Sequence, residues 1–254
     1  MFRIFALMNN YITSFPISSF RVDCHKRLKP YAFMTMAQEV ANLNASALGC
    51  GYSHLLEHNI TWVLSRMKTE YVKSPIFLQD TVMETWHKGM NGPFSIRDFE
   101  VRDASTSEIL VRCTTSWVLV DLDSRHLVRM DRYIGPLLEQ TAIKKDAIVK
   151  PAGKIKPRSE ITFAMSHKVL FSDIDYNMHV NNAKYMEWAI DVIDARERAD
   201  TSNREIASYE ITFNNEARME DIIDIYIGNI SDRERYVEGR RGNEIIFQSI
   251  INFL

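Results

Sequence analysis

A short polar stretch holds the side chains in this sequence that are best placed to do chemistry. In "DIDYNMHV", Asp175, Asn177 and His179 alternate with Tyr176 and Met178. In an extended segment, this period-two spacing directs the three polar side chains to one side. Together they offer a proton donor or acceptor and groups that orient it.

The helix expected after this stretch adds a second chemical feature. The run "NAKYMEWAIDVIDAR" (182–196) has apolar residues at helical spacing. The start of a helix exposes unpaired backbone N–H groups and the positive end of the helix dipole. We expect the N–H groups of Val180, Asn181 and Asn182 to stabilise the oxyanion that forms when a thioester or ester carbonyl is attacked.

A simpler interpretation of the same stretch is purely structural. Asp175 or Asn177 would cap the helix, and His179 would be a surface residue. Such residues are common near helix starts. The choice between the two interpretations therefore rests on the rest of the chain.

A distant carboxylate favours the catalytic interpretation. Glu216 lies in the strand-like run 205–217, where an acid fits poorly unless it faces water or has a function. A gapless alignment that places Asp80 opposite Asp221 puts Pro75 opposite Glu216. The first half also has no DxNxH before its long helix. We therefore expect one working site in the chain.

The elements that must position these residues occur twice. The first half has a strand-like stretch at 14–22, helical spacing at 29–51, a short helix at 52–59, and strand-like runs at 61–72, 80–90, 94–103 and 109–123. The second half has a strand-like stretch at 161–172, the helix at 182–196, and strand-like runs at 205–217, 221–230, 235–239 and 244–254. A helix followed by an antiparallel meander, repeated once, indicates duplication of one α+β unit.

Composition limits the classes of function. The chain has 31 basic and 33 acidic side chains, so it lacks the overall positive field of a dedicated nucleic-acid binder. Cys24, Cys50 and Cys113 are widely spaced and form no zinc-binding pattern, which is typical of a reduced cytoplasmic protein. No run approaches the roughly eighteen apolar residues that cross a bilayer. The N-terminal "MFRIFALMNN" lacks the cleavage site of a signal peptide.

The sequence resembles the plant-type fatty acyl-ACP thioesterases, in which two hot-dog units are joined in tandem. The resemblance runs over most of the chain, through "WVLSRMKTEYVKSPIFLQDTVMETW", "RDFEVRD" and "TTSWVLVDLDSRHLVRM". It is most specific at "DIDYNMHVNNAKYMEW", although the shorter tail HVNN-x-K/R-Y also occurs in single hot-dog acyl-CoA thioesterases. The resemblance implies an α+β fold of two tandem hot-dog units, each a long helix wrapped by an antiparallel sheet.

The same resemblance implies that Asp175, Asn177, His179 and Glu216 form the active centre. The plant enzymes commonly have a cysteine directly after the acid, where this chain has Ala217. We therefore expect a water nucleophile, activated by Glu216 directly or through His179. Asn177 would position the water or the carbonyl, and Asp175 would orient its neighbours. Which of Glu216 and His179 takes the proton is left open.

The implied partner is an acyl carrier protein that carries a phosphopantetheine-linked acyl chain. No cofactor, metal, nucleic acid or stable membrane insertion is expected, and two chains could form a homodimer. A basic linker, 144–160, separates an acyl-binding unit, 1–143, from a catalytic unit, 161–254. We expect this linker to be exposed, either as a solvated connector or as a docking patch for the acidic carrier. Arg66 and Arg97 are further candidates to face the carrier.

Four large apolar residues of the first half have two possible roles. They can line a tunnel for the acyl chain, as the resemblance suggests, or simply form the core. These residues are Trp62, Met67, Trp86 and Trp117.

The sequence thus predicts a cytoplasmic acyl-ACP thioesterase, in a bacterial form because no plastid leader precedes the first unit. It would release a free fatty acid and the carrier thiol. The alternatives are an acyl-CoA thioesterase that uses the same residues and a non-catalytic sensor of acyl thioesters. A sensor would be expected to carry a DNA-binding or partner domain, and no helix-turn-helix or basic extension is visible.

Overall fold

A computed structural model describes residues 9–196 and 204–254 of the chain. Residues 1–8, which make up most of the N-terminal run "MFRIFALMNN", lie outside the described residues. Within the described ranges, no helix is both long enough and apolar enough to cross a membrane.

The described strands form one antiparallel sheet in the order β1-β3-β4-β5-β2-β8-β11-β10-β9-β7, with β6 paired to β5. The first-half strands are β1 (Asn10–Pro16), β2 (Ile60–Tyr71), β3 (Asp80–Asn91), β4 (Phe94–Asp103), β5 (Ile109–Asp121) and β6 (Leu127–Val128). The second-half strands are β7 (Thr162–Lys168), β8 (Ile206–Phe213), β9 (Ile222–Ser231), β10 (Glu234–Arg241) and β11 (Glu244–Phe253). Because β1-β3-β4-β5-β2 matches β7-β9-β10-β11-β8, one five-stranded unit occurs twice.

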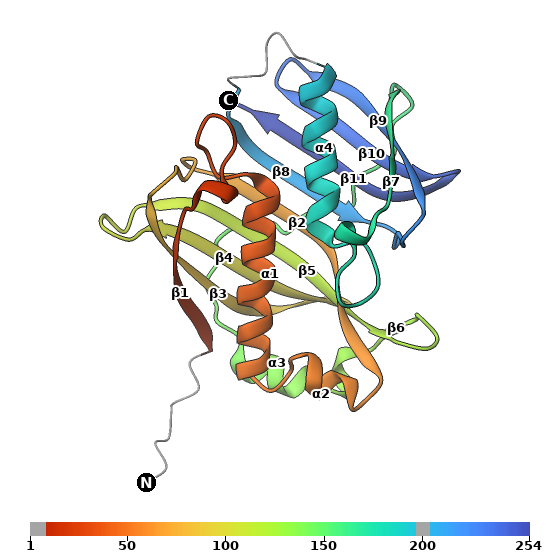
Figure 1. Ribbon diagram of the computed structural model, residues 1–254. Helices are drawn as coiled ribbons and strands as arrows, with labels where there is room; N and C mark the ends of the chain where they lie inside the picture. Colours follow the sequence, from red (N-terminus) through yellow and green to blue (C-terminus); the bar gives the residue numbers. More distant parts are fainter. Residues whose placement is uncertain (1–8, 197–203) are drawn as a thin grey trace.

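Two long helices lie side by side on one face of this sheet (Figure 1). They are α1 (Pro30–Ala47) and α4 (Asn182–Arg196). Proline suits the first turn of α1, and Gly49, at φ 82°, follows its end. The shorter helices α2 (Tyr52–Leu56) and α3 (Gly135–Thr141) lie near the C-terminal end of α1. The α+β fold of two tandem hot-dog units is confirmed.

The two units join where β2 pairs with β8. The pairing runs antiparallel from Arg66 opposite Thr212 to Glu70 opposite Ser208. Each unit alone would leave this strand edge open, and the pairing satisfies its backbone groups. Buried residues of both long helices consequently belong to a single hydrophobic core.

The strand expected at 14–22 is shorter and begins earlier. β1 ends at Pro16, and a 3₁₀ turn, η1 (Ser19–Arg21), follows. Proline has no N–H with which to extend the ladder. Ile17 then hydrogen-bonds to the loop before β3 instead of continuing along the sheet.

Matched hydrogen bonds correct the register of the repeat. The Val169 N–H donates to the carbonyl of Asp221 at 2.8 Å, and the Ile17 N–H donates to the carbonyl of Gln79 at 2.9 Å in the same way. Gln79, and not Asp80, is therefore the counterpart of Asp221. The two aspartates match in residue type but differ by one position in the backbone.

The segment 144–160 is exposed over most of its length, as expected, but it is attached to the sheet and is not a free connector. It crosses behind the sheet, on the face opposite the long helices (Figure 1). The Ala147 N–H donates to Oδ2 of Asp98 at 2.8 Å, and Nζ of Lys88 lies 3.0 Å from the same oxygen. Asp98 is fully buried. The segment therefore covers a face of the sheet that carries buried charge, which explains why several of its own residues, Ala147, Ile148, Ala152 and Ile155, are buried.

Removing the Asp98 carboxylate tests this attachment. Asp98→Ala should lower the free energy of unfolding by about 2 kcal/mol, because it leaves the buried Ala147 N–H without an acceptor and removes one of the two carboxylates beside Lys88, which keeps Asp146. Urea denaturation measures the loss. Asp131→Ala, which removes an exposed partner of Arg129, is the matched control and should cost less than about 1 kcal/mol. Similar small losses in both variants would contradict a firmly held crossing segment.

Candidate active site

The segment from Asp175 to His179 is a tight loop in front of α4. The Asp175 N–H donates to the His179 carbonyl at 2.8 Å, and the Met178 N–H donates to the Asp175 carbonyl at 3.0 Å. Oδ1 of Asp175 accepts the Asn177 N–H at 2.8 Å. Met178 has φ 65°, in the left-handed region. The expected extended approach is therefore wrong, because the loop folds back on its own backbone.

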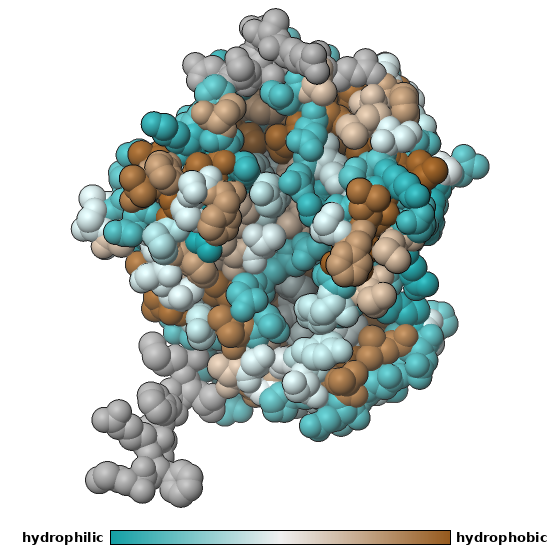
Figure 2. All heavy atoms as spheres, in the orientation of Figure 1, coloured by the Kyte–Doolittle hydropathy of each residue, from teal (hydrophilic) through white to brown (hydrophobic). Residues whose placement is uncertain are grey.

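Exposed apolar side chains surround this loop. Figure 2 shows hydrophobic residues on the surface there, and the exposed fractions are 84% for Phe171, 72% for Tyr176 and 70% for Met178. The Tyr176 ring packs edge-to-face on Tyr52 of the first half, with centroids 5.5 Å apart. The surface around the loop thus extends across both halves.

The first half contains the same loop, with different side chains. The Asp23 N–H donates to the Arg27 carbonyl at 2.8 Å, and the Lys26 N–H donates to the Asp23 carbonyl at 3.0 Å. Oδ1 of Asp23 accepts the His25 N–H at 2.8 Å, and Lys26 has φ 65°. The backbone of the loop is therefore preserved between the halves.

A further hydrogen bond identifies the counterpart of Glu216. The Val180 N–H donates at 2.9 Å to the carbonyl of the residue after Glu216. The equivalent N–H of the first half, from Leu28, donates to the carbonyl of Pro75 at 2.8 Å. Ser74 is therefore the counterpart of Glu216, one residue away from the expected Pro75.

Arginine and serine thus replace histidine and glutamate in the first half. Arg27 takes the place of His179, and its Nε lies 3.4 Å from Oδ2 of Asp23. Ser74 cannot act as a carboxylic acid. These two positions in the first half therefore hold no acid–base pair.

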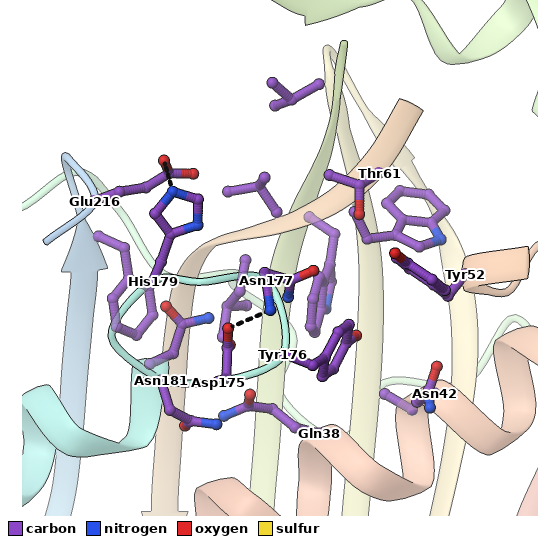
Figure 3. A pocket seen from close by; sticks show the side chains of 18 of the residues that line it. Gln38, Asn42, Tyr52, Thr61, Asp175, Tyr176, Asn177, His179, Asn181 and Glu216 are labelled. Atoms are coloured by element: carbon purple, nitrogen blue, oxygen red, sulfur yellow. Dashed lines mark hydrogen bonds and ion pairs between the residues drawn. The ribbon is translucent and has the colours of Figure 1, made fainter. Parts of the chain in front are cut away.

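His179 and Glu216 form such a pair in the second half. Nε2 of His179 lies 2.9 Å from Oε2 of Glu216. Figure 3 shows the two side chains meeting from the loop before α4 and the loop after β8. Asp175 and Asn177 line the same cavity.

Glu216 does not lie within a strand as expected. β8 ends at Phe213, and the N–H groups of Asn214 and Asn215 both donate to one carbonyl of β11, at 2.8 and 3.1 Å. These two hydrogen bonds to a single acceptor end the strand pairing and turn the chain. The acid is consequently presented from a loop, where its side chain is free of the sheet's alternation.

Arg125 reaches this pair from the first half. Its Nη2 pairs with Oε1 of Glu216, whose other oxygen faces His179. Arg125 lies in the turn between β5 and β6, with φ 59°. Sequence reasoning missed this residue, because only the fold brings that turn beside the loop after β8.

The pKa of His179 lies below its ordinary value of 6.5. Burial is the main cause, since it disfavours the charged imidazolium, and the cations Arg125 and Arg218 add to it. Asp175 acts in the opposite direction. His179 is therefore neutral at pH 7 and can accept a proton.

Two of the three backbone N–H groups expected to hold an oxyanion are already used. The Val180 N–H donates to Ala217 at 2.9 Å, and the Asn181 N–H donates to Asp173 at 2.8 Å. The expectation is wrong for these two groups, because both serve to fix the loop. Asn182 is the first residue of α4, and its N–H meets no acceptor within the described residues.

Asn181 caps α4, and neither Asp175 nor Asn177 does. Oδ1 of Asn181 accepts the Ala183 N–H at 2.9 Å, and its carbonyl accepts the Lys184 N–H at 2.9 Å. An asparagine at this position satisfies N–H groups that the helix leaves open. The structural interpretation of Asp175 and Asn177 as caps is therefore wrong.

A cavity of about 830 Å³ lies behind the loop and is lined by both halves. This volume is within the usual range for small-molecule sites. Trp62 and Trp117 line it, together with residues of α1. Met67 and Trp86 do not, and both are buried. The tunnel interpretation thus fits two of the four large residues and the core interpretation fits the other two.

The two candidate carrier-facing arginines are both engaged with the first unit. Arg97 is 7% exposed, lines the cavity and donates to Oδ1 of Asn44 at 2.6 Å. The guanidinium of half-buried Arg66 lies over the ring of Phe94, 4.8 Å from its centroid. Buried Arg97 presents no free charge to a protein partner, so the expectation is wrong for it, whereas a carrier contact by Arg66 stays a prediction.

The cysteines are poorly suited to act as nucleophiles. Cys50 lines the cavity, but burial raises the pKa of its thiol, an effect that Arg97 only partly opposes. Burial also raises the pKa of the Cys113 thiol. Thiols with raised pKa values stay protonated at neutral pH. Cys24 is exposed and does not line the cavity.

Two family models match the chain. The acyl-ACP thioesterase N-terminal domain matches residues 8–135, and the acyl-ACP thioesterase C-terminal domain matches residues 156–245.

Curated relatives include plant enzymes. A chloroplastic dodecanoyl-[acyl-carrier-protein] hydrolase of Cinnamomum camphora is 27% identical over 83% of this chain and 57% of its own length. The chloroplastic oleoyl-acyl carrier protein thioesterase 2 of Arabidopsis thaliana is 26% identical over 85% of this chain and 62% of its own. The chain thus spans about three fifths of the length of these relatives.

Solved structures share the whole fold. An acyl-ACP thioesterase from Bacteroides thetaiotaomicron superimposes with a TM-score of 0.85 and 25% identity, covering 97% of this chain and 98% of that one. The 12:0-ACP thioesterase from Umbellularia californica gives a TM-score of 0.84 at 21% identity, covering 100% and 99%.

The charge environment of His179 can be measured directly. Arg218→Gln should raise the pKa of His179, because it removes one of the cations that oppose protonation. NMR titration of the imidazole resonances gives both values, and the wild-type value should lie below 6.5. Arg129→Gln, which changes an exposed arginine paired with Asp131, should leave the titration unchanged. A wild-type pKa above 6.5, or no response to Arg218→Gln, would contradict this electrostatic description.

Proposed function

Because the chain belongs to the acyl-ACP thioesterase family, we propose that it hydrolyses fatty acyl thioesters of an acyl carrier protein to a free fatty acid and the carrier thiol. One observation carries the proposal: His179 and Glu216 lie 2.9 Å apart beside a cavity of about 830 Å³ built from both halves. The pair supplies acid–base chemistry, and the cavity supplies room for an acyl chain.

Water is the nucleophile in this reaction. Glu216, directly or through neutral His179, takes a proton from a water molecule whose oxygen attacks the thioester carbon. When the tetrahedral intermediate collapses, the C–S bond breaks and the proton passes to the sulfur. The hydroxyl group stays on the acyl carbon, so the products are the free acid and the carrier thiol. Ala217 and the raised pKa values of the buried thiols support water over cysteine.

The remaining site residues hold this pair and the substrate in place. Arg125 fixes the Glu216 carboxylate from the side opposite His179. Asp175 orders the loop through the Asn177 N–H, which leaves the exposed Asn177 amide at the cavity to position the water or the carbonyl. Positioning of this kind lowers the entropic cost of the reaction.

The acyl chain is proposed to bind in the first unit. Trp62, Trp117 and the two alanines of α1 that line the cavity supply apolar surface. Arg97 and the polar residues of α1 add polar groups to the wall. The lining residues belong to 1–143 apart from those of the catalytic loop, α4 and the segment around Glu216. In this proposal the first unit binds the acyl chain, and the second unit, 161–254, carries the catalytic pair.

A protein carrier suits the surface beside the loop. Phe171, Tyr176 and Met178 are largely exposed, and apolar patches of this kind favour contact with a protein. Coenzyme A offers no comparable apolar surface. This contrast favours an acyl carrier over acyl-CoA, the alternative substrate.

A panel of acyl-ACPs of different chain length tests the proposal by release of free thiol. We expect turnover by the wild-type protein, and a loss of about 10³-fold or more in Glu216→Gln, which removes the proton acceptor. Glu220→Gln is a matched control in the same loop, where the exposed carboxylate forms an ion pair with Lys168, and should change turnover less than about twofold.

The same acyl chain presented on coenzyme A completes the test. We expect a preference for the carrier of more than a few fold in kcat/KM. Equal rates on both thioesters would favour the acyl-CoA alternative. Substantial turnover by Glu216→Gln would contradict the assigned pair, and binding of acyl-ACP without turnover by the wild type would indicate a sensor.

A further inference from the structure

The proposed reaction needs a hydrogen-bond donor for the thioester carbonyl, and the backbone at the start of α4 is largely occupied. The N–H groups of Val180 and Asn181 donate to backbone carbonyls. Those of Ala183 and Lys184 donate to Asn181 itself. Among these first groups, only the N–H of Asn182 remains, whereas oxyanion sites commonly use more than one donor.

A side chain on the facing helix has an unused donor. Gln38 lies on α1 and lines the same cavity as Asp175, Asn177 and His179. Its Nε2 is buried and has no hydrogen-bond partner among the residues that the structure describes. Figure 3 shows its amide pointing from α1 toward the loop, beside Asp175. A buried amide without a partner is unfavourable and calls for a functional explanation.

We propose that Gln38 donates a hydrogen bond from Nε2 to the carbonyl oxygen of the bound thioester. This inference rests on the proposed hydrolase function and adds a residue to its catalytic site. When water attacks the carbonyl carbon, negative charge develops on that oxygen, and the Gln38 N–H stabilises it without giving up its proton. The N–H of Asn182 serves as the second donor.

The duplication supports this role independently. The hydrogen bonds that precede the two helices make Leu28 the counterpart of Val180 in the repeat. Ten residues further along each half, Gln38 is the counterpart of Ile190. Isoleucine offers no donor. The first-half loop lacks the His–Glu pair, and by the symmetry of the repeat the helix that faces it is α4, which has isoleucine in place of the amide. The side-chain donor therefore accompanies the acid–base pair.

The assignment also explains why the site needs both halves. The first half supplies Gln38 and Arg125, and the second half supplies His179 and Glu216. Neither unit alone would contain a proton acceptor and the side-chain donor for the oxyanion together.

Steady-state kinetics on acyl-ACP provide the first test. Gln38→Ala should lower kcat by about 10²-fold to 10³-fold with little change in KM, because the lost bond strengthens in the transition state. Gln38→Glu should be at least as damaging, since a carboxylate would repel the oxyanion. Gln140→Ala, at an exposed glutamine of α3, is the control and should match the wild type. Urea denaturation should show that all three variants remain folded.

Infrared spectroscopy provides a test that does not depend on turnover. In the Glu216→Gln background, acyl-ACP labelled with ¹³C at the carbonyl should show its C=O stretch shifted to lower frequency on binding, and Gln38→Ala should remove most of that shift. A change in kcat of less than threefold would overturn the assignment. So would a C=O stretching frequency of bound acyl-ACP that is the same with and without Gln38→Ala. Because the band reports on bound substrate, this result is separate from failure of the wild type to hydrolyse acyl-ACP, which would contradict the proposed function instead.

Discussion

The pairing of β2 with β8 is the interaction on which the rest of the structure depends. It closes the open edge of each five-stranded unit and makes one sheet. Met67 and Ile211 face each other within it and are both buried. The pairing holds α1 next to the loop before α4, so Gln38 of one half lines the same cavity as His179 of the other. The site is therefore a property of the joined units.

Duplication has separated the shape of the loop from its chemistry. The two loops share their backbone hydrogen bonds and a residue at φ 65°, yet Arg27 stands in place of His179. A backbone that holds itself through internal bonds tolerates such exchanges of side chains, because the exchanged groups do not carry the fold. One loop could thus lose its acid–base function while still starting a helix in the same way.

The sequence predicted the elements well and long-range placement poorly. Apolar periodicity identified both long helices, and residue types singled out the stretch from Asp175 to His179 as a candidate site, although they predicted an extended segment where the structure has a tight loop. The predicted alignment of the two halves is off by one residue, because it matches Asp80 with Asp221 by residue type, whereas the backbone hydrogen bonds make Gln79 the counterpart of Asp221. Glu216 was assigned to a strand, because nothing local reveals that two consecutive N–H groups share one acceptor. The sequence pattern does not reveal Arg125, because its role depends on a contact between the two halves.

The central claim is that one chain holds one working site, formed between its halves. Calorimetric titration with an acyl-pantetheine analogue, in which a methylene group replaces the thioester sulfur, measures this directly. The structure predicts one equivalent bound per chain, because only the second loop combines His179 and Glu216 with a facing amide on α1. Binding of two equivalents per chain would contradict it, since the first loop would then form a site of its own.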